Sequence, residues 1–131
     1  ANLWDANLQG ATLLGANLQG AILWMTNLQR AILWIANLRE ADLREAHLKQ
    51  ALLLQANLLG TNLRQANLRG AILRQTNLQG ANLSSANLIG ADLIGANLER
   101  ANLQGAKVTP EQLRQAASLE GAIMRDGTVH E

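Results

Sequence analysis

The chain has 131 residues, a formal net charge of +1 at pH 7 and no cysteine. This length suits a single domain, and the absence of cysteine excludes disulfides and thiolate metal sites. A net charge this close to zero argues against a strong nucleic-acid binder and equally against an acidic mimic of nucleic acid.

From Ala1 onward the sequence repeats every five residues. Leu stands at every fifth position from Leu3 to Leu103, and Ala or Thr precedes each Leu by two positions. An extended segment places two such residues on one side of the chain. Because the next Ala comes three positions after Leu, the chain must turn once per repeat to keep every Leu inside. Nine of the eleven Gly fall on the last position of a repeat, where a turn with positive φ suits Gly.

Apolar residues at outward positions indicate that four repeats close one coil of 20 residues. The residue before Leu is usually polar, and the exceptions are Ile22, Ile32, Leu52 and Ile72, the last three of which are 20 residues apart. A period of 15 would scatter these residues over all sides. We therefore predict about five stacked coils paired like a parallel sheet, with first, second, third and fourth sides beginning at residues 1, 6, 11 and 16.

The pattern resembles that of the pentapeptide-repeat family, A-(D/N)-L-x-x. ANLQG at 16–20, ADLRE at 41–45 and ANLIG at 86–90 match it closely, and the resemblance covers residues 1 to about 107. It implies an all-β fold, a right-handed quadrilateral (four-sided) parallel β-helix with Leu and Ala inside. It does not imply one function, since members of the family do unrelated things.

After Gly105 the repeat fades and a helix is expected. Thr109 suits the N-cap, Pro110 the first helical position, and Gln112 completes a capping box. We predict a short helix over about 110–117, with Leu113 facing the last coil, that shields the open end of the core. The predicted domains are the repeat β-helix, 1–109, and a C-terminal capping helix and tail, 110–131. This tail resembles those of cyanobacterial members of the family.

The third side carries apolar residues at outward positions. A contiguous apolar patch on a soluble protein usually marks a contact surface. The alternative is that these side chains only strengthen contacts between coils or lie under a missing segment. The candidate interaction patch, called the third-side patch below, consists of Leu14, Ile32, Trp34, Ile35, Leu52, Leu54 and Ile72.

Other surface features favour structural interpretations. Trp4 and Trp24 form a smaller apolar candidate, for which simple stacking is at least as good an explanation. The Asn residues before Leu can bond to the nearby backbone, which we prefer to a role in binding ice or carbohydrate. Three arginines on successive sides of one coil form a basic belt, and we interpret them as solvated charges among acidic neighbours. These arginines are Arg64, Arg69 and Arg74.

No catalytic, cofactor or metal site is predicted. His47 stands alone and His130 lies in the tail. We therefore expect a non-enzymatic scaffold or docking rod whose partner is an unknown protein or a second copy. The alternative is a DNA-mimicking topoisomerase-binding protein, as one class of this family is, but the slightly basic charge disfavours it. The hypothesis that the chain is a β-helix enzyme has still less support.

The cellular context stays open. No nucleic-acid partner is expected, and a membrane enters only through segments missing from this chain. The uncapped coil at Ala1 indicates that more coils precede it in a larger protein or that this end pairs with another molecule. The protein is then cytoplasmic, or membrane-associated through an upstream segment, and its oligomeric state is not determined by the sequence.

Overall fold

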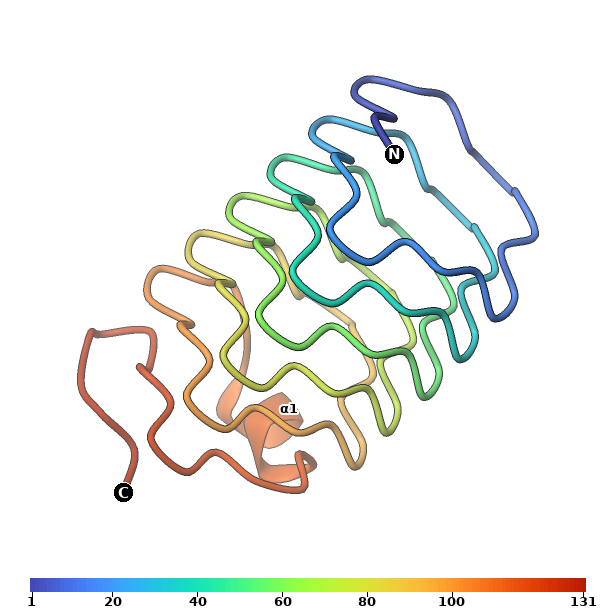
Figure 1. Cartoon of the computed structure of the whole chain (residues 1–131). Coiled ribbons are helices and arrows are strands. Elements are labelled where there is room, and N and C mark those ends of the chain that lie inside the picture. Colours follow the sequence, from blue (N-terminus) through green and yellow to red (C-terminus); the bar gives the residue numbers. More distant parts are fainter.

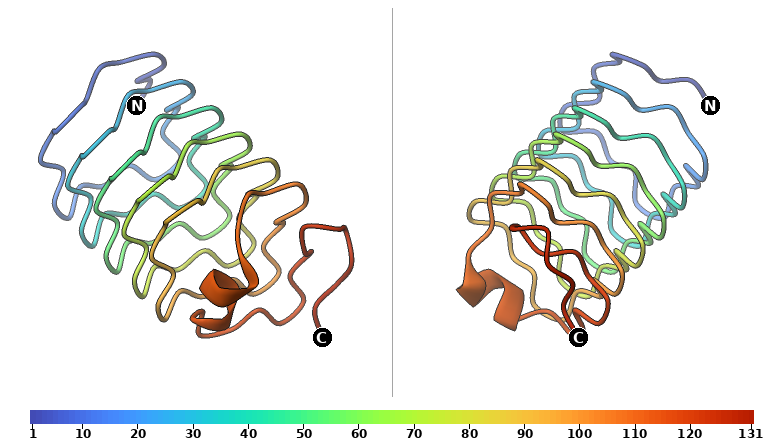
Figure 2. Two further views of the ribbon diagram at one scale, coloured as in Figure 1. Left: turned by 180° about the vertical axis from the view of Figure 1, so that it is seen from behind. Right: turned by 90° about the vertical axis from the view of Figure 1, so that its left-hand side faces the viewer.

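The computed structural model describes all residues, 1–131, and shows four-sided coils stacked along one axis (Figures 1 and 2). Each side forms a parallel bridge with the side 20 residues later, as in the pair Asn2 and Ile22 and the pair Thr12 and Ile32. The interval holds to the bridge between Asn87 and Lys107. The predicted 20-residue period is therefore confirmed. Each bridge joins a single pair of residues, so the structure contains no strand longer than one residue.

Every repeat ends in a turn that contains a left-handed residue. The Ala6 N–H donates to the Leu3 carbonyl at 3.0 Å, and this bond recurs along the coil. The last position of the repeat has positive φ in twelve non-glycine residues and in nine glycines. Positive φ at the third position of a turn is the requirement of a type II turn. The coil therefore imposes this conformation whether or not glycine is present.

Ala and Leu fill the inside of the coil. Every repeat Leu from Leu23 to Leu103 is fully buried. The four Leu of the first coil are only partly buried, because no coil covers their outer side in the structure. Burying a Leu side chain contributes roughly 1.5–3 kcal/mol, so the stacked Leu columns are the main source of stability.

Three repeats have Thr in place of the inward Ala, and all three side chains are fully buried. A buried hydroxyl without a partner is costly. Each of these hydroxyls donates to a Leu carbonyl of the adjacent coil at 2.7–2.8 Å. The donor–acceptor pairs are Thr26 with Leu3, Thr61 with Leu38, and Thr76 with Leu53.

The only helix, α1 (Pro110–Arg114), is shorter than predicted. Its predicted capping box is confirmed, since the Gln112 N–H donates to Thr109 Oγ1 and the Thr109 N–H donates to Gln112 Oε1. Leu113 packs on the core as expected. The helix ends early because the chain returns to coil pairing at Ala117, whose N–H donates to the Ala96 carbonyl. No helix has the length and hydrophobicity that membrane crossing requires.

The tail beyond α1 continues the coil. Asn97 bridges to Ser118 and Asn102 to Ile123, both in the parallel sense. Ile123 then pairs with Val129 in the antiparallel sense, so the chain folds back on itself at the C-terminal end (Figure 2). This segment and α1 together cover the last coil.

Candidate functional site

The third-side patch lies on one wall of the coil. Its central column is formed by Ile32, Leu52 and Ile72, which bridge in register. Leu14, Trp34 and Ile35 are the most solvent-accessible members, with exposed fractions of 57%, 43% and 58%; the other four are half-buried. The structure thus brings all seven predicted residues together, and their role in binding stays a prediction.

The wall beneath the patch makes its ladder hydrogen bonds between neighbouring coils, and among the patch residues only the N–H groups of Leu14, Trp34 and Leu54, at the corner, have no protein acceptor. The Ile32 N–H donates to the Ala11 carbonyl, and the Ile35 N–H donates to the Leu54 carbonyl. Addition of a strand requires an edge with free N–H and C=O groups. Since the coils already pair with one another, a partner on this wall binds mainly through side chains.

A shallow basic hollow borders the patch at the corner between the second and third sides. Its volume is about 430 Å³. Gly70 and Gly90 leave the backbone exposed there, and the side chains of Lys49 and Arg69 flank it without forming an ion pair. The lining residues are Lys49, Gln50, Arg69, Gly70, Ile89 and Gly90.

From the sequence, Arg69 is interpreted as a solvated charge and the hollow is not predicted. The signal that identifies it is the 20-residue interval, which separates Lys49 from Arg69 and Gly70 from Gly90. The two cations therefore lie on neighbouring coils, and so do the two glycines, which have no side chain. An ion pair between Arg74 and Asp92 limits the apolar wall toward the C-terminal end.

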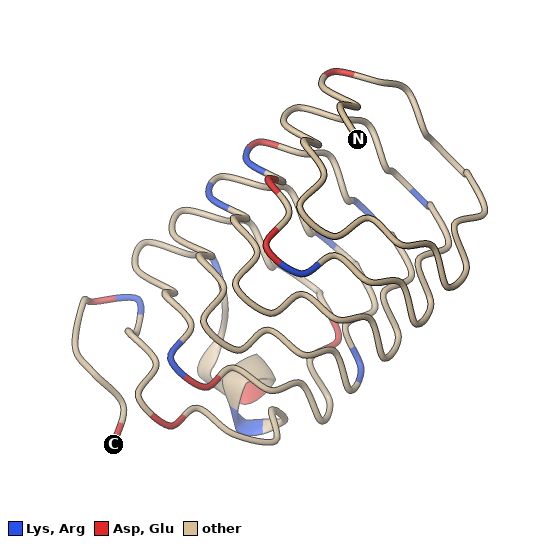
Figure 3. Cartoon of the chain, in the orientation of Figure 1, with Lys and Arg blue, Asp and Glu red and all other residues tan.

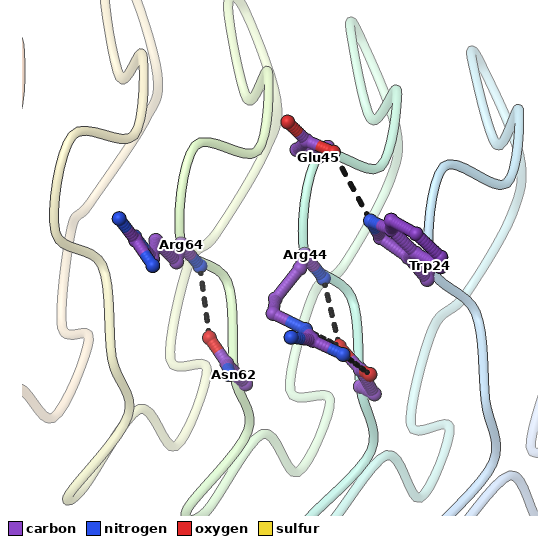
Figure 4. A network of polar contacts seen from close by, with 6 residues as sticks. Trp24, Arg44, Glu45, Asn62 and Arg64 are labelled. Atoms are coloured by element: carbon purple, nitrogen blue, oxygen red, sulfur yellow. Dashed lines mark hydrogen bonds and ion pairs between the residues drawn. The ribbon is translucent and has the colours of Figure 1, made fainter.

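The Trp pair on the first side is engaged within the molecule, with Trp24 beside Glu45 (Figure 4). The rings of Trp4 and Trp24 are stacked with centroids 5.7 Å apart, and the Arg44 guanidinium lies 5.6 Å from the centroid of the Trp24 ring. Trp24 Nε1 donates to Glu45 Oε2 at 3.0 Å. Arg44 also donates two side-chain hydrogen bonds to Asp42, which hold the pKa of that carboxyl below its ordinary value. These contacts support the stacking interpretation of this column.

The polar residue before Leu has a structural role, as predicted. In fifteen repeats its Oδ1 accepts a hydrogen bond from the backbone N–H two residues later, at 3.0–3.2 Å. Asn and Asp stabilise turns in this way. The Asn column on the fourth side therefore serves the turns of the coil.

Titratable side chains do not converge on a reaction centre. His47 is exposed in a column between Asn27 and Asn67. No three His, Asp or Glu side chains lie close enough together to bind a metal ion. Figure 3 shows acidic and basic residues interspersed along the coils, and two of the acids, Asp42 and Asp92, are paired with arginines.

The largest cavity, about 730 Å³, lies at the C-terminal end between α1 and the tail. Its apolar lining includes Val108, Leu113, Leu119 and Met124, which close the end of the core. Two of its polar side chains are already engaged, Arg114 with Glu111 and Asp126 with Thr128. Its geometry is therefore that of a cap over the core.

Comparison with known proteins agrees with this architecture. Residues 1–34, 36–75 and 76–109 match the family model described as pentapeptide repeats, in eight copies. No curated protein matches the chain.

Similar solved structures include two cyanobacterial proteins. HetL, a pentapeptide repeat protein involved in heterocyst differentiation regulation in Nostoc sp. strain PCC 7120, is 36% identical, with 98% of this chain and 70% of HetL covered and a TM-score of 0.43. Rfr23 from Cyanothece 51142 is 42% identical over 76% of this chain and 60% of Rfr23, with a TM-score of 0.40. A pentapeptide repeat protein of the Arabidopsis thaliana thylakoid lumen is 27% identical over 92% of this chain and 85% of that protein, with a TM-score of 0.46.

Proposed function

Because the chain belongs to the pentapeptide-repeat family, whose members form right-handed quadrilateral β-helices, we propose that it is a non-enzymatic docking rod. The third-side patch is the surface that binds a protein partner. The observation that carries this proposal is the exposure of Leu14, Trp34 and Ile35 on a wall whose coils are already paired with one another. In this proposal residues 1–109 supply the wall and residues 110–131 close its end.

The rigidity of the wall supports the proposal. Each patch residue projects from a backbone held by neighbouring coils, so binding orders few additional groups. Trp34 lies between Leu14 and Leu54 in its column, near the middle of the patch. Trp residues near the centre of an apolar surface contribute strongly to protein association.

Ile35 supplies a second argument. It occupies the left-handed turn position at φ 52°, where a β-branched residue is an outlier. Its side chain is nonetheless mostly exposed, so burial in the core does not explain its presence. Backbone strain that is maintained at a surface position is typical of functional sites.

The test uses the double variant Trp34→Ser/Leu54→Ser. Ligands are first selected on the wild-type protein from a displayed library of helical peptides, and self-association is measured by sedimentation equilibrium. The double variant is expected to keep its circular dichroism spectrum and to lose either the dimer or at least about tenfold in ligand affinity, as removal of central anchors requires.

The matched control is Trp4→Ser/Leu59→Ser, which removes the same two side-chain types from the first and fourth sides. It is expected to retain binding. Unchanged binding by the Trp34→Ser/Leu54→Ser variant contradicts the assignment of the patch.

A further inference from the structure

The basic hollow beside the third-side patch narrows the class of partner, on the premise that the patch is the docking surface. We infer that the partner is an amphipathic helix with an acidic edge. Its apolar face lies along the patch, and carboxylates on one flank enter the hollow between Lys49 and Arg69. The hollow lies at the corner that begins the third side, because Gly70 comes two residues before Ile72.

The wall favours a helix over an extended segment. A helix satisfies its own backbone, which suits a wall whose coils are already paired with one another. The central apolar column repeats once per coil, at about 4.8 Å. Successive helix turns are about 5.4 Å apart, whereas same-face residues of a strand are about 6.7 Å apart. Over three coils a helix therefore keeps closer register with Ile32, Leu52 and Ile72.

The charge along the two edges of the patch is asymmetric. Arg30, Lys49 and Arg69 lie at the corner with the second side, and none of them forms an ion pair. At the same repeat positions, the corner with the fourth side carries a single charged residue, Arg74. The one acid on the third side, Asp92, is already paired with Arg74. The complement of this surface is apolar with negative charge on one edge.

The glycines make room for the partner's carboxylates. A methyl group added at Gly90 would meet only the backbone of Gly70, at 3.9–4.0 Å, so this part of the corner holds no side chain. Lys49 and Arg69 flank that space. A carboxylate entering it forms charge-assisted hydrogen bonds with both cations.

The same asymmetry favours a helix over an anionic membrane. A planar bilayer contacts both edges of a flat wall equally, so a membrane-binding surface needs positive charge around the apolar patch. Here the only charged residue on one edge, Arg74, is already paired with Asp92. A single acidic flank on a helix matches one basic edge.

The experiment uses the full chain and two fluorescently labelled helical peptides of about five turns. Both carry the same Leu face, and one carries Glu along one flank where the other carries Lys. The Glu peptide is expected to bind at least about tenfold more tightly at about 50 mM salt, and the difference to shrink at about 500 mM. Fluorescence anisotropy measures both affinities.

Charge reversal provides the decisive comparison. The Lys49→Glu/Arg69→Glu variant is expected to prefer the Lys peptide, which a merely unfolded variant cannot do. Arg64→Glu alters an unpaired arginine on the first side of the coil that contains Arg69, and it is expected to keep the wild-type preference.

Three results overturn the inference. The first is equal binding of the two peptides; if the Trp34→Ser/Leu54→Ser variant then loses both, the docking surface stands and only the acidic partner is wrong. The second is that neither peptide binds. In that case the ligands selected from the peptide library still test whether the patch is a docking surface. The third is binding to phosphatidylserine vesicles, dependent on Lys49 and Arg69, without binding of the Glu peptide.

Discussion

A single left-handed residue at each corner allows the chain to turn every five residues. For a residue with a Cβ this conformation costs roughly 1–2 kcal/mol, and glycine avoids most of that cost. Twelve corners nevertheless carry other residues. The stacked core must therefore offset the strain at these positions. The fold does not require glycine at a corner, so the corner residue can be one that contributes to surface binding.

Ile35→Gly tests this trade between stability and surface chemistry. The side chain is mostly exposed, so its removal sacrifices little burial, while glycine relieves the strain at φ 52°. We expect the free energy of unfolding to rise by about 0.5–1 kcal/mol while affinity for selected ligands falls. The matched change is Gly20→Ala, where nothing lies within 4 Å of the added methyl group; urea unfolding should show it to be destabilised by a similar amount. A less stable Ile35→Gly variant contradicts the argument.

Asp42 provides a pH-dependent test. The side-chain hydrogen bonds from Arg44 keep its pKa below the ordinary value of 3.8 in the folded protein. The resulting stabilisation is present above that ordinary value and is lost as the pH falls through the lower, folded value. Asp42→Asn retains the acceptor for the Arg44 backbone N–H, so we expect a weaker acid dependence of unfolding and a loss at pH 7 below about 1 kcal/mol. Arg44→Gln should weaken the acid dependence to the same extent; full acid dependence in either variant rules out the pair as its source.

The side of the coil is the next level of organisation, and α1 replaces one side in the last turn. Gln112 makes this replacement possible. Its Oε1 completes the capping box, and its Nε2 donates to the carbonyls of Leu88 and Ala91 at 2.7 and 2.9 Å. The Gln112 side chain thus donates to two carbonyls of the last complete coil that receive no hydrogen bond from the backbone of α1.

Gln112→Glu separates these two roles. A glutamate still accepts the Thr109 N–H, but it offers no donor and places negative charge beside two carbonyls. We expect a loss of about 2 kcal/mol or more, larger than the loss of about 1 kcal/mol from removing the N-cap in Thr109→Ala. Hydrogen exchange at Leu113 and Ala117 should report the local opening. Equal effects of the two variants mean that the capping box alone holds α1.

The sequence predicts some elements better than others, and the reason is the range of the interaction. Thr109 and Gln112 are three residues apart, so their capping box is visible locally. The early end of α1 depends on Ala117 reaching Ala96, a contact that no local pattern reveals. The basic hollow also escaped prediction, because it is defined by the absence of side chains at Gly70 and Gly90 on stacked coils.

At the scale of the whole molecule, fold and surface are encoded by different periods. The core needs only Leu and Ala or Thr every five residues, and all repeats supply them. The third-side patch needs apolar residues every 20 residues, because columns form only between successive coils. The five-residue pattern therefore predicted the architecture, while the partner depends on the less regular outward positions.

Removing one repeat should separate the effects of the five-residue period and the 20-residue period. Deleting residues 36–40 leaves a continuous five-residue pattern, so the coil can close again with the same inward residues. The columns shift by one side, however, and Asn57 and Leu59 then follow Ile32 and Trp34 in place of Leu52 and Leu54. The patch is divided across a corner, and we expect ligand binding to be lost while the circular dichroism spectrum is retained.

The control deletion is 81–85, which also removes one repeat of zero net charge but leaves every patch residue in its original column. Both variants lose one side of the solenoid, so their thermal midpoints should fall by similar amounts. Binding should survive only in the second variant. If both variants bind equally well, the alignment of residues between coils does not create the docking surface, and the interaction must be sought elsewhere on the rod.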